Sequence, residues 1–324
     1  MLINCYYYAP HNHTMLTEHI EADLNTMVEI GTDVVSICLQ ESQIENWHWK
    51  HVDNFIQLAH QAGLKVHAVP NRWAGIFAGW LDGFSSFSMQ NQHLLVEDIN
   101  GSPIIKGEMV CCVNKPDVRE YIENNLLYMF AKFDFDGIIW DEPHAAFCHC
   151  QHCKAKGINS FEMANRSFCS FLDHISLASK AQGRDIVTSV FTQPQNDKLL
   201  DALVETVNID YIGSDGHLRS PGHQMHRMKG TIFEVYDKFA HKIKAAGKQT
   251  FFLIEGQRHR DEDLENYLDN VDAAFSMPMD HLMYYFSAHE MSPEKEKIFN
   301  RATWNAVKNL KKAKPELVLS GKEH

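Results

Sequence analysis

The chain has 324 residues, of which 44% are hydrophobic and 22% are charged, and its formal net charge is −12. This composition is typical of a globular protein with a sizeable core. The acidic balance argues against a nucleic-acid partner, which would require a basic face. No apolar run reaches the roughly 18 residues of a membrane span. The first residues lack the pattern of a secretory signal peptide, so we expect a cytoplasmic protein with no membrane partner.

The chain alternates short apolar runs, typical of buried parallel strands, with longer segments of helical period. Eight apolar runs occur, at residues 2–8, 33–41, 65–73, 137–143, 185–193, 209–217, 249–257 and 281–290. Four of the helical segments end just before a strand on a glycine, a residue that readily takes the left-handed conformation. These glycines are Gly31, Gly63, Gly183 and Gly247.

Eight such units without a visible linker predict a closed (β/α)8 TIM barrel, and the alternative is an open, doubly wound α/β sheet. We expect a single catalytic domain over residues 1–313, followed by a polar tail over residues 314–324. Active sites of TIM barrels lie at the carboxyl ends of the strands. The ends of the predicted strands are far more polar than a barrel requires, and we predict that several of these residues bind substrate. They are His11, Glu41, Asn71, Arg72, Trp73, Asp215, His217, Tyr284 and His289.

A long connection, at about residues 74–116, separates the third predicted strand from the next helix. Connections of this length in compact domains are usually lids or binding loops. Together with the strand end it carries five large aromatic residues, Trp73, Phe77, Trp80, Phe84 and Phe87. Aromatic faces suit the apolar faces of sugar rings, so Trp80 is a further candidate for substrate binding. The alternative is that these aromatic residues only pack the loop onto the barrel.

Two glutamates end predicted strands on opposite sides of the barrel. Glu142 ends the fourth strand and Glu255 ends the seventh, each after a run of apolar residues. A carboxyl group at the edge of a low-dielectric core tends to have a raised pKa, which suits a general acid at neutral pH. Two carboxylates that face one cavity are the minimal apparatus for cleaving a glycosidic bond. The alternative is that each glutamate pairs with a nearby Arg72, Arg258 or histidine.

A cysteine cluster follows Glu142. Cys148, Cys150 and Cys153 have the Cys-x-Cys-x-x-Cys spacing that brings three thiolates within reach of one ion. Tetrahedral zinc needs a fourth ligand, and a site with four sulfurs is closed and therefore structural. Either Cys111 or Cys112 can supply this ligand, with His149 or His152 in reserve. The remaining cysteines, Cys5, Cys38 and Cys169, are expected in the core.

At this point the chain resembles a known family. The segment CVNKPDVREY (residues 112–121) precedes a helix, the segment FDGIIWDE (residues 135–142) and then the cysteine cluster. This order resembles the β-galactosidases of glycoside hydrolase family 42 and the glycoside-hydrolase-like families around them. The resemblance implies zinc bound by Cys112, Cys148, Cys150 and Cys153. In the wider clan A of retaining glycosidases it also implies that Glu142 is the acid/base and Glu255 the nucleophile.

The chain departs from clan A at the residue before the acid/base, which is usually Asn and here is Asp141. This leaves open whether Asp141 is itself catalytic. The chain is also too short for the additional C-terminal domains of family 42. We expect a carbohydrate substrate, and the sequence leaves a homo-oligomer open.

Two rival functions fit the same barrel. One is a sugar isomerase or epimerase that holds a divalent metal with Glu142, Asp215, His217 and Glu290. The other is a non-catalytic carbohydrate-binding barrel, because a fold does not fix a function.

Overall fold

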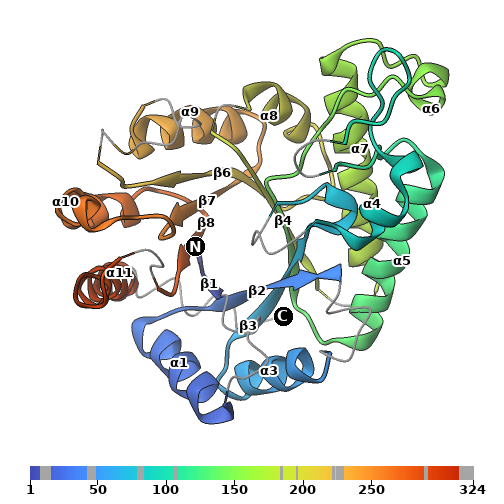
Figure 1. Cartoon of the computed structure of the whole chain (residues 1–324). Helices are drawn as coiled ribbons and strands as arrows, with labels where there is room; N and C mark the ends of the chain where they lie inside the picture. Colours follow the sequence, from blue (N-terminus) through green and yellow to red (C-terminus); the bar gives the residue numbers. More distant parts are fainter. Residues whose placement is uncertain are drawn as a thin grey trace.

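Eight parallel strands close into a barrel in the order β1 to β8 (Figure 1). The computed structural model describes residues 1–7, 16–41, 49–78, 84–105, 109–182, 185–194, 196–220, 223, 230–287 and 291–313. The strands are β1 (Leu2–Tyr7), β2 (Val34–Gln40), β3 (Lys65–Asn71), β4 (Gly137–Asp141), β5 (Val187–Thr192), β6 (Tyr211–His217), β7 (Gln249–Glu255) and β8 (His281–Tyr285). All eight lie within the predicted runs, and closure of β8 onto β1 confirms the barrel over the open sheet.

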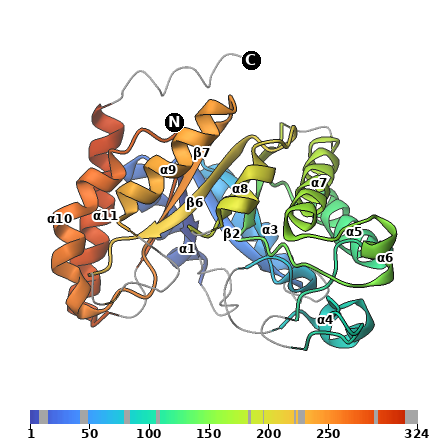
Figure 2. The ribbon, with the colours of Figure 1, turned by 90° about the horizontal axis from the view of Figure 1, so that it is seen from above.

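Helices surround the barrel, as Figures 1 and 2 show. They are α1 (Thr17–Ile30), α3 (Trp49–Gln61), α4 (Ser86–Gln90), α5 (Pro116–Lys132), α6 (Gln151–Ala155), α7 (Phe161–Lys180), α8 (Asp197–Leu203), α9 (Ile232–Ala245), α10 (Leu264–Phe275) and α11 (Pro293–Ala313). Gly31, Gly63 and Gly247 have positive φ angles of 97°, 85° and 71°, as their positions before strands predicted, whereas Gly183 lies outside the described residues. In the part of the chain that the structure describes, no helix combines the length and the apolar character of a bilayer span.

Alternation along each strand separates two buried layers. One set of side chains, which includes Val69, Ile139 and Leu253, packs inside the barrel. Their neighbours, such as Trp140 and Ile254, pack between the barrel and the helices. Because the side-chain period of a strand is two residues, Asn71, Asp141 and Glu255 follow on the interior face at the carboxyl ends of β3, β4 and β7.

The same alternation gives the position of Tyr284, a predicted substrate contact. Its neighbour Tyr285 belongs to the interior cluster, so Tyr284 faces the helices. Tyr284 is fully buried, and its hydroxyl forms a 2.7 Å hydrogen bond with Thr32. The Tyr284 hydroxyl therefore has a protein partner, and its substrate contact stays a prediction.

The long connection after β3 packs most of its aromatic residues onto the barrel. Trp73 is fully buried, and its Nε1 donates to the Leu39 carbonyl at 3.0 Å. Phe77 stacks on Trp140, and Phe87 stacks on Tyr121 of α5. The Trp73 ring is therefore part of the core, and its substrate contact stays a prediction.

The two remaining aromatic residues of this connection are Phe84 and Trp80. Phe84 is 58% exposed, whereas Trp80 lies outside the described residues. The substrate-binding role of Trp80 stays a prediction.

Candidate active site

Four carboxyl groups gather at the carboxyl ends of β4, β6 and β7. They belong to Asp141, Glu142, Asp215 and Glu255. Burial raises the pKa of Asp215 well above its ordinary value, and the neighbouring Glu142 and Glu255 carboxyls raise it further. Side chains from opposite sides of the barrel therefore lie close enough to affect the protonation of Asp215 and Glu255.

Asp141 ends β4 and is buried. The Tyr6 hydroxyl donates a 2.8 Å hydrogen bond to its Oδ2. Burial raises the pKa of Asp141 to about 8, with a further contribution from the charge of Glu142, while Tyr6 and Arg72 oppose the rise. Asp141 is thus largely protonated at neutral pH and can donate a hydrogen bond.

Glu255 combines an ion pair with the carboxyl contacts. The Arg219 guanidinium lies 3.3 Å from Glu255 Oε2, and the Glu255 side chain is 13% exposed. Burial raises the pKa of Glu255, whereas the hydrogen bond with Asp215 and the charges of Arg219 and Arg258 lower it. Glu255 therefore pairs with an arginine and also lies near the other carboxyls. The sequence analysis treats these two arrangements as alternatives.

Glu142 directly follows β4 in an unusual backbone conformation. Its φ angle is 34°, in the left-handed region that costs a non-glycine residue on the order of 1–3 kcal/mol and often marks functional sites. Its N–H donates to the Phe191 carbonyl at 3.0 Å, and Gln193 Nε2 donates to Glu142 Oε2 at 3.1 Å. Contacts from the end of β5 thus fix both the backbone and the side chain of Glu142.

Glu41, a predicted substrate contact, instead anchors the long connection. Its buried carboxylate accepts hydrogen bonds from Ala74 N (2.8 Å), Ser85 Oγ (2.7 Å), Ser86 Oγ (3.0 Å) and Phe87 N (3.3 Å). With these four donors, both carboxylate oxygens are occupied by the protein itself. The substrate contact of Glu41 stays a prediction, and the structure gives its carboxylate this anchoring role.

This arrangement predicts a large effect on stability for Glu41→Ala. Hydrogen bonds to charged groups contribute about 1.5–3 kcal/mol, and removal of the shared acceptor leaves buried donors unpaired. We expect Glu41→Ala to lower the free energy of unfolding by about 3 kcal/mol in urea titrations. Glu29→Ala on the exposed face of α1 is the matched control and should change it by less than about 0.5 kcal/mol. A Glu41→Ala protein as stable as this control would contradict the anchoring role.

The other predicted substrate contacts divide into two groups. Asn71, Arg72 and His217 are buried at the carboxyl ends of β3 and β6, and the charge of Arg72 reaches Asp141. His11 and His289 lie outside the described residues, as does Glu290.

Sequence analysis missed two residues of this site, Tyr6 and Arg219. Tyr6 alternates with Asn4 on the interior face of β1, so the period-two pattern could have placed it there. Arg219 comes two residues after β6, where no pattern predicts that its side chain turns back to Glu255.

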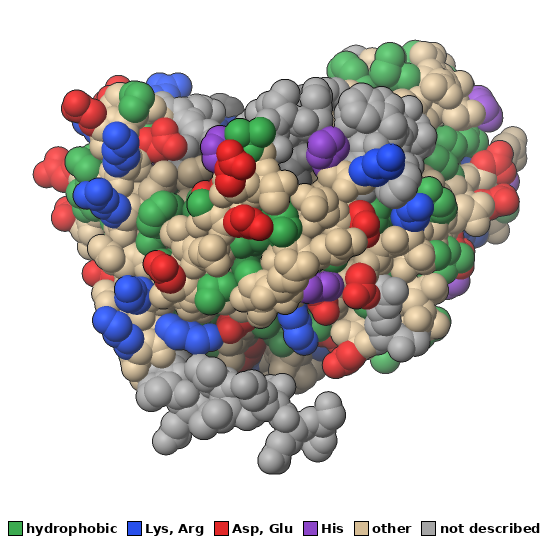
Figure 3. Space-filling view, turned by 90° about the horizontal axis from the view of Figure 1, so that it is seen from below, with side chains coloured by type: hydrophobic (Ala, Val, Ile, Leu, Met, Phe, Trp, Pro, Cys, Tyr) green, Lys and Arg blue, Asp and Glu red, His purple; other side chains and the backbone are tan. Residues whose placement is uncertain are grey.

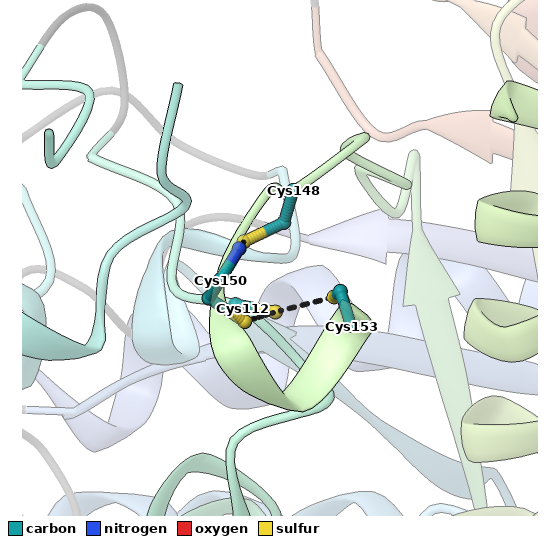
Figure 4. A group of neighbouring side chains, drawn as sticks. All are labelled: Cys112, Cys148, Cys150 and Cys153. Atoms are coloured by element: carbon teal, nitrogen blue, oxygen red, sulfur yellow. Dashed lines mark hydrogen bonds between the residues drawn. The ribbon is translucent and has the colours of Figure 1, made fainter. Parts of the chain in front are cut away.

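The four cysteines Cys112, Cys148, Cys150 and Cys153 form a buried cluster (Figure 4). Their sulfurs all lie within 4.8 Å of one another, and Cys112 Sγ is 3.5 Å from Cys153 Sγ. Among the described residues, this is the one group of three or more Cys, His, Asp or Glu side chains placed to hold a metal ion.

The surroundings of the cluster fit thiolate ligands. The Glu97 N–H donates to Cys148 Sγ at 3.3 Å, and Asn114 Nδ2 donates to Cys153 Sγ at 3.4 Å. Hydrogen bonds with Cys112 and Cys153 lower the pKa of Cys148. Cys111 faces Ser88 Oγ instead, at 3.3 Å, so the structure selects Cys112 over Cys111 as the fourth member.

The cluster joins two segments that lie far apart in the sequence. Cys112 ends the long connection after β3, whereas Cys148, Cys150 and Cys153 lie in and before α6, shortly after Glu142. The end of the connection after β3 and the segment after β4 thereby lie side by side.

A closed (β/α)8 barrel with carboxyl groups at its mouth is the class that fold and site define. No family model and no curated protein sequence matches the chain. Solved structures of glycoside hydrolases do share its fold. The α-L-fucosidase isoenzyme 2 of Paenibacillus thiaminolyticus has a TM-score of 0.58 at 14% identity, over 98% of this chain and 50% of that one.

Two further structures extend this likeness. The β-galactosidase of Rahnella sp. R3 has a TM-score of 0.64 at 14% identity, over 97% of this chain and 55% of that one. The catalytic domain of the Paenibacillus polymyxa β-amylase has a TM-score of 0.58 at 10% identity, over 97% and 98%. The chain therefore has the fold of these barrels and spans about half the length of the fucosidase and the galactosidase.

Proposed function

We propose that this protein is a glycoside hydrolase that cleaves a glycosidic bond with retention of configuration. The observation that carries the proposal is the meeting of Glu142 and Glu255, from β4 and β7, at the carboxyl of Asp215. Glu142 is the general acid/base and Glu255 the nucleophile. The fold shared with glycosidases and the resemblance around residues 112–153 support the same assignment.

The reaction follows from the roles of two carboxyls. Glu142 protonates the leaving oxygen while Glu255 attacks the sugar carbon, and Glu142 then activates the water that releases the sugar. Retaining enzymes hold these groups about 5–5.5 Å apart, whereas inverting enzymes leave about 6.5–9.5 Å for a water.

We also propose that the four cysteines hold one structural zinc ion. Four sulfur ligands at this spacing suit a closed tetrahedral site, which leaves no position for a substrate. When bound, the metal would cross-link the two loops and would take no part in the hydrolysis.

The substrate is a carbohydrate. The face in Figure 3 does not favour a polyanionic ligand instead. There, Lys and Arg side chains are interspersed with Asp and Glu and form no continuous basic patch. An acidic chain with such a face is a poor match for polyanions.

A screen of aryl glycosides and oligosaccharides, with product configuration followed by NMR, tests the proposal. Turnover with retained configuration is the expected result, and it should survive brief treatment with a weak chelator. Turnover that needs an added divalent ion and rearranges a free sugar would favour the isomerase. Binding without turnover would favour the carbohydrate-binding barrel.

A further inference from the structure

Asn114 joins the cysteine cluster to two neighbouring helices. It lies two residues after Cys112, shortly before α5, and it is buried. Its Nδ2 donates to Cys153 Sγ at 3.4 Å. Its Oδ1 accepts from Lys156 Nζ at 3.0 Å and from Ser167 Oγ of α7 at 2.8 Å. One amide therefore contacts a sulfur of the cluster, a cation that directly follows α6 and a hydroxyl of α7.

The contacts of the oxygen determine which way the Asn114 amide points. A lysine ammonium has three donors and no acceptor, so the atom that faces Lys156 must be the oxygen. The nitrogen then faces Cys153, where its N–H needs a sulfur that accepts. A charged thiolate accepts such a bond more strongly than a neutral thiol does. The amide is therefore oriented for a deprotonated Cys153, which is the form that binds a metal ion.

The other N–H donors to the cluster, within the described residues, are backbone groups. Those of Glu97 and Cys150 donate to Cys148 Sγ at 3.3 and 3.4 Å. Apart from the cysteines themselves, Asn114 is the one described side chain that donates to a sulfur of the cluster. A substitution can remove this donor, whereas it leaves the backbone donors in place.

We propose that Asn114 is a positioning residue of the metal site and that its hydrogen bond to Cys153 strengthens zinc binding by the four cysteines. This inference rests on the proposed zinc site and deepens it, and it does not depend on the proposed hydrolysis. Four thiolates around one divalent ion leave a net negative charge, and a hydrogen bond to sulfur disperses part of that charge. Lys156 and Ser167 polarise the amide from its oxygen side, which makes its N–H a stronger donor.

Asn114→Asp separates this role from a purely structural one. Aspartate has the size of asparagine and keeps an acceptor for Lys156 and Ser167, but a carboxylate cannot donate to Cys153. A residue that only joined the two helices would tolerate the change. The inference instead predicts weaker zinc binding, because an oxygen lone pair then faces the thiolate. We expect a loss of about 10- to 100-fold in zinc affinity, the usual effect of losing such a partner of a ligand.

Competition with a chromophoric chelator of known affinity measures zinc binding by the full chain. Asn114→Ala lacks the donor as well and should lose zinc affinity in the same range of about 10- to 100-fold. Asn124→Asp, at an exposed position of α5, introduces the same charge and is the matched control. It should keep the affinity of the parent protein. Asn114→Asp with the affinity of this control would overturn the inference.

Cobalt supplies a readout that packing alone does not change. Co²⁺ in place of zinc should give sulfur-to-cobalt charge-transfer bands in the near ultraviolet. A hydrogen bond stabilises the sulfur lone pairs and so moves such a band to higher energy. In Asn114→Asp the bands should therefore shift to lower energy, whereas in Asn124→Asp they should stay in place. Unshifted bands in Asn114→Asp would show that the amide does not act on the sulfur and would overturn the inference.

Lys156→Gln tests the same contact without a change to the buried amide. We expect a loss of about two- to fivefold in zinc affinity, the size of one exposed charge interaction, and it should shrink at high salt. Lys154→Gln removes an equal charge from an exposed position of α6 and is the matched control. Because the Lys156 side chain is exposed, this variant should fold even where Asn114→Asp does not. Lys156→Gln with the affinity of Lys154→Gln would then overturn the inference.

Failure of the inference is distinguishable from failure of the proposals beneath it. A parent protein that binds neither zinc nor cobalt would overturn the zinc site, and the inference with it. A parent protein that binds zinc no better than Asn114→Asp does would overturn the inference alone. Neither result bears on Glu142 and Glu255, because the assay measures no turnover.

Discussion

Glu255→Gln should be the most damaging single substitution for turnover. The amide keeps the size of the side chain but cannot attack the sugar carbon, and it loses the charge that pairs with Arg219 at 3.3 Å. Glu142→Gln should lower kcat by about 10²–10⁴, the usual contribution of a general acid. Steady-state kinetics on the best aryl glycoside of the screen measures both effects.

Azide separates the two roles. Azide should restore the activity of Glu142→Gln on substrates whose leaving group needs little protonation. The product should have retained configuration, because Glu255 still forms the intermediate. Azide should restore Glu255→Gln with inverted configuration, because azide then attacks the sugar directly. The exposed Glu265→Gln on α10 is the control and should keep full activity. Glu255→Gln with full activity would disprove the assignment and shift attention to Asp141, Asp215 or Glu290.

The strands of the barrel could be predicted closely because a buried parallel strand needs a continuous apolar run. The ends of these runs also predicted Asp141, Glu142, Asp215 and Glu255, since a charge that follows an apolar run must lie at the barrel mouth. Their catalytic roles remain predictions. The choice of Cys112 over Cys111 required the structure, because adjacent residues face opposite directions and spacing alone cannot orient them.

A position at a strand end does not fix the direction of a side chain, and three predicted contacts show why the sequence could not do so. Tyr284 lies one residue out of phase with the interior face, and Trp73 turns into the core at the start of the 3-10 helix Trp73–Gly75. Glu41 reaches the correct end of the barrel, but backbone and serine donors of the long connection occupy it. Such contacts between distant segments leave no periodic signal in the sequence.

Loss of the proposed zinc should cost more stability than any substitution at the mouth. Zinc-finger peptides bind structural zinc with an apparent free energy of about 10–16 kcal/mol at pH 7, and that energy contributes directly to folding. Elemental analysis should find near one zinc per chain, and a strong chelator should lower the unfolding temperature as the metal leaves.

Cys150→Ser tests the same site with a single atom changed. It should lower the free energy of unfolding by about 4 kcal/mol or more, a size that point substitutions reach when a metal is lost. Cys169→Ser is the matched control, because Cys169 is buried on α7 outside the cluster, and it should keep the zinc. Four sulfurs close the site, so the metal takes no part in catalysis. The folded fraction of Cys150→Ser should therefore keep the pH profile of kcat/KM, which depends on Glu142 and Glu255. A protein free of metal, in which all four thiols react under native conditions, would contradict the zinc site while leaving the two glutamates untouched.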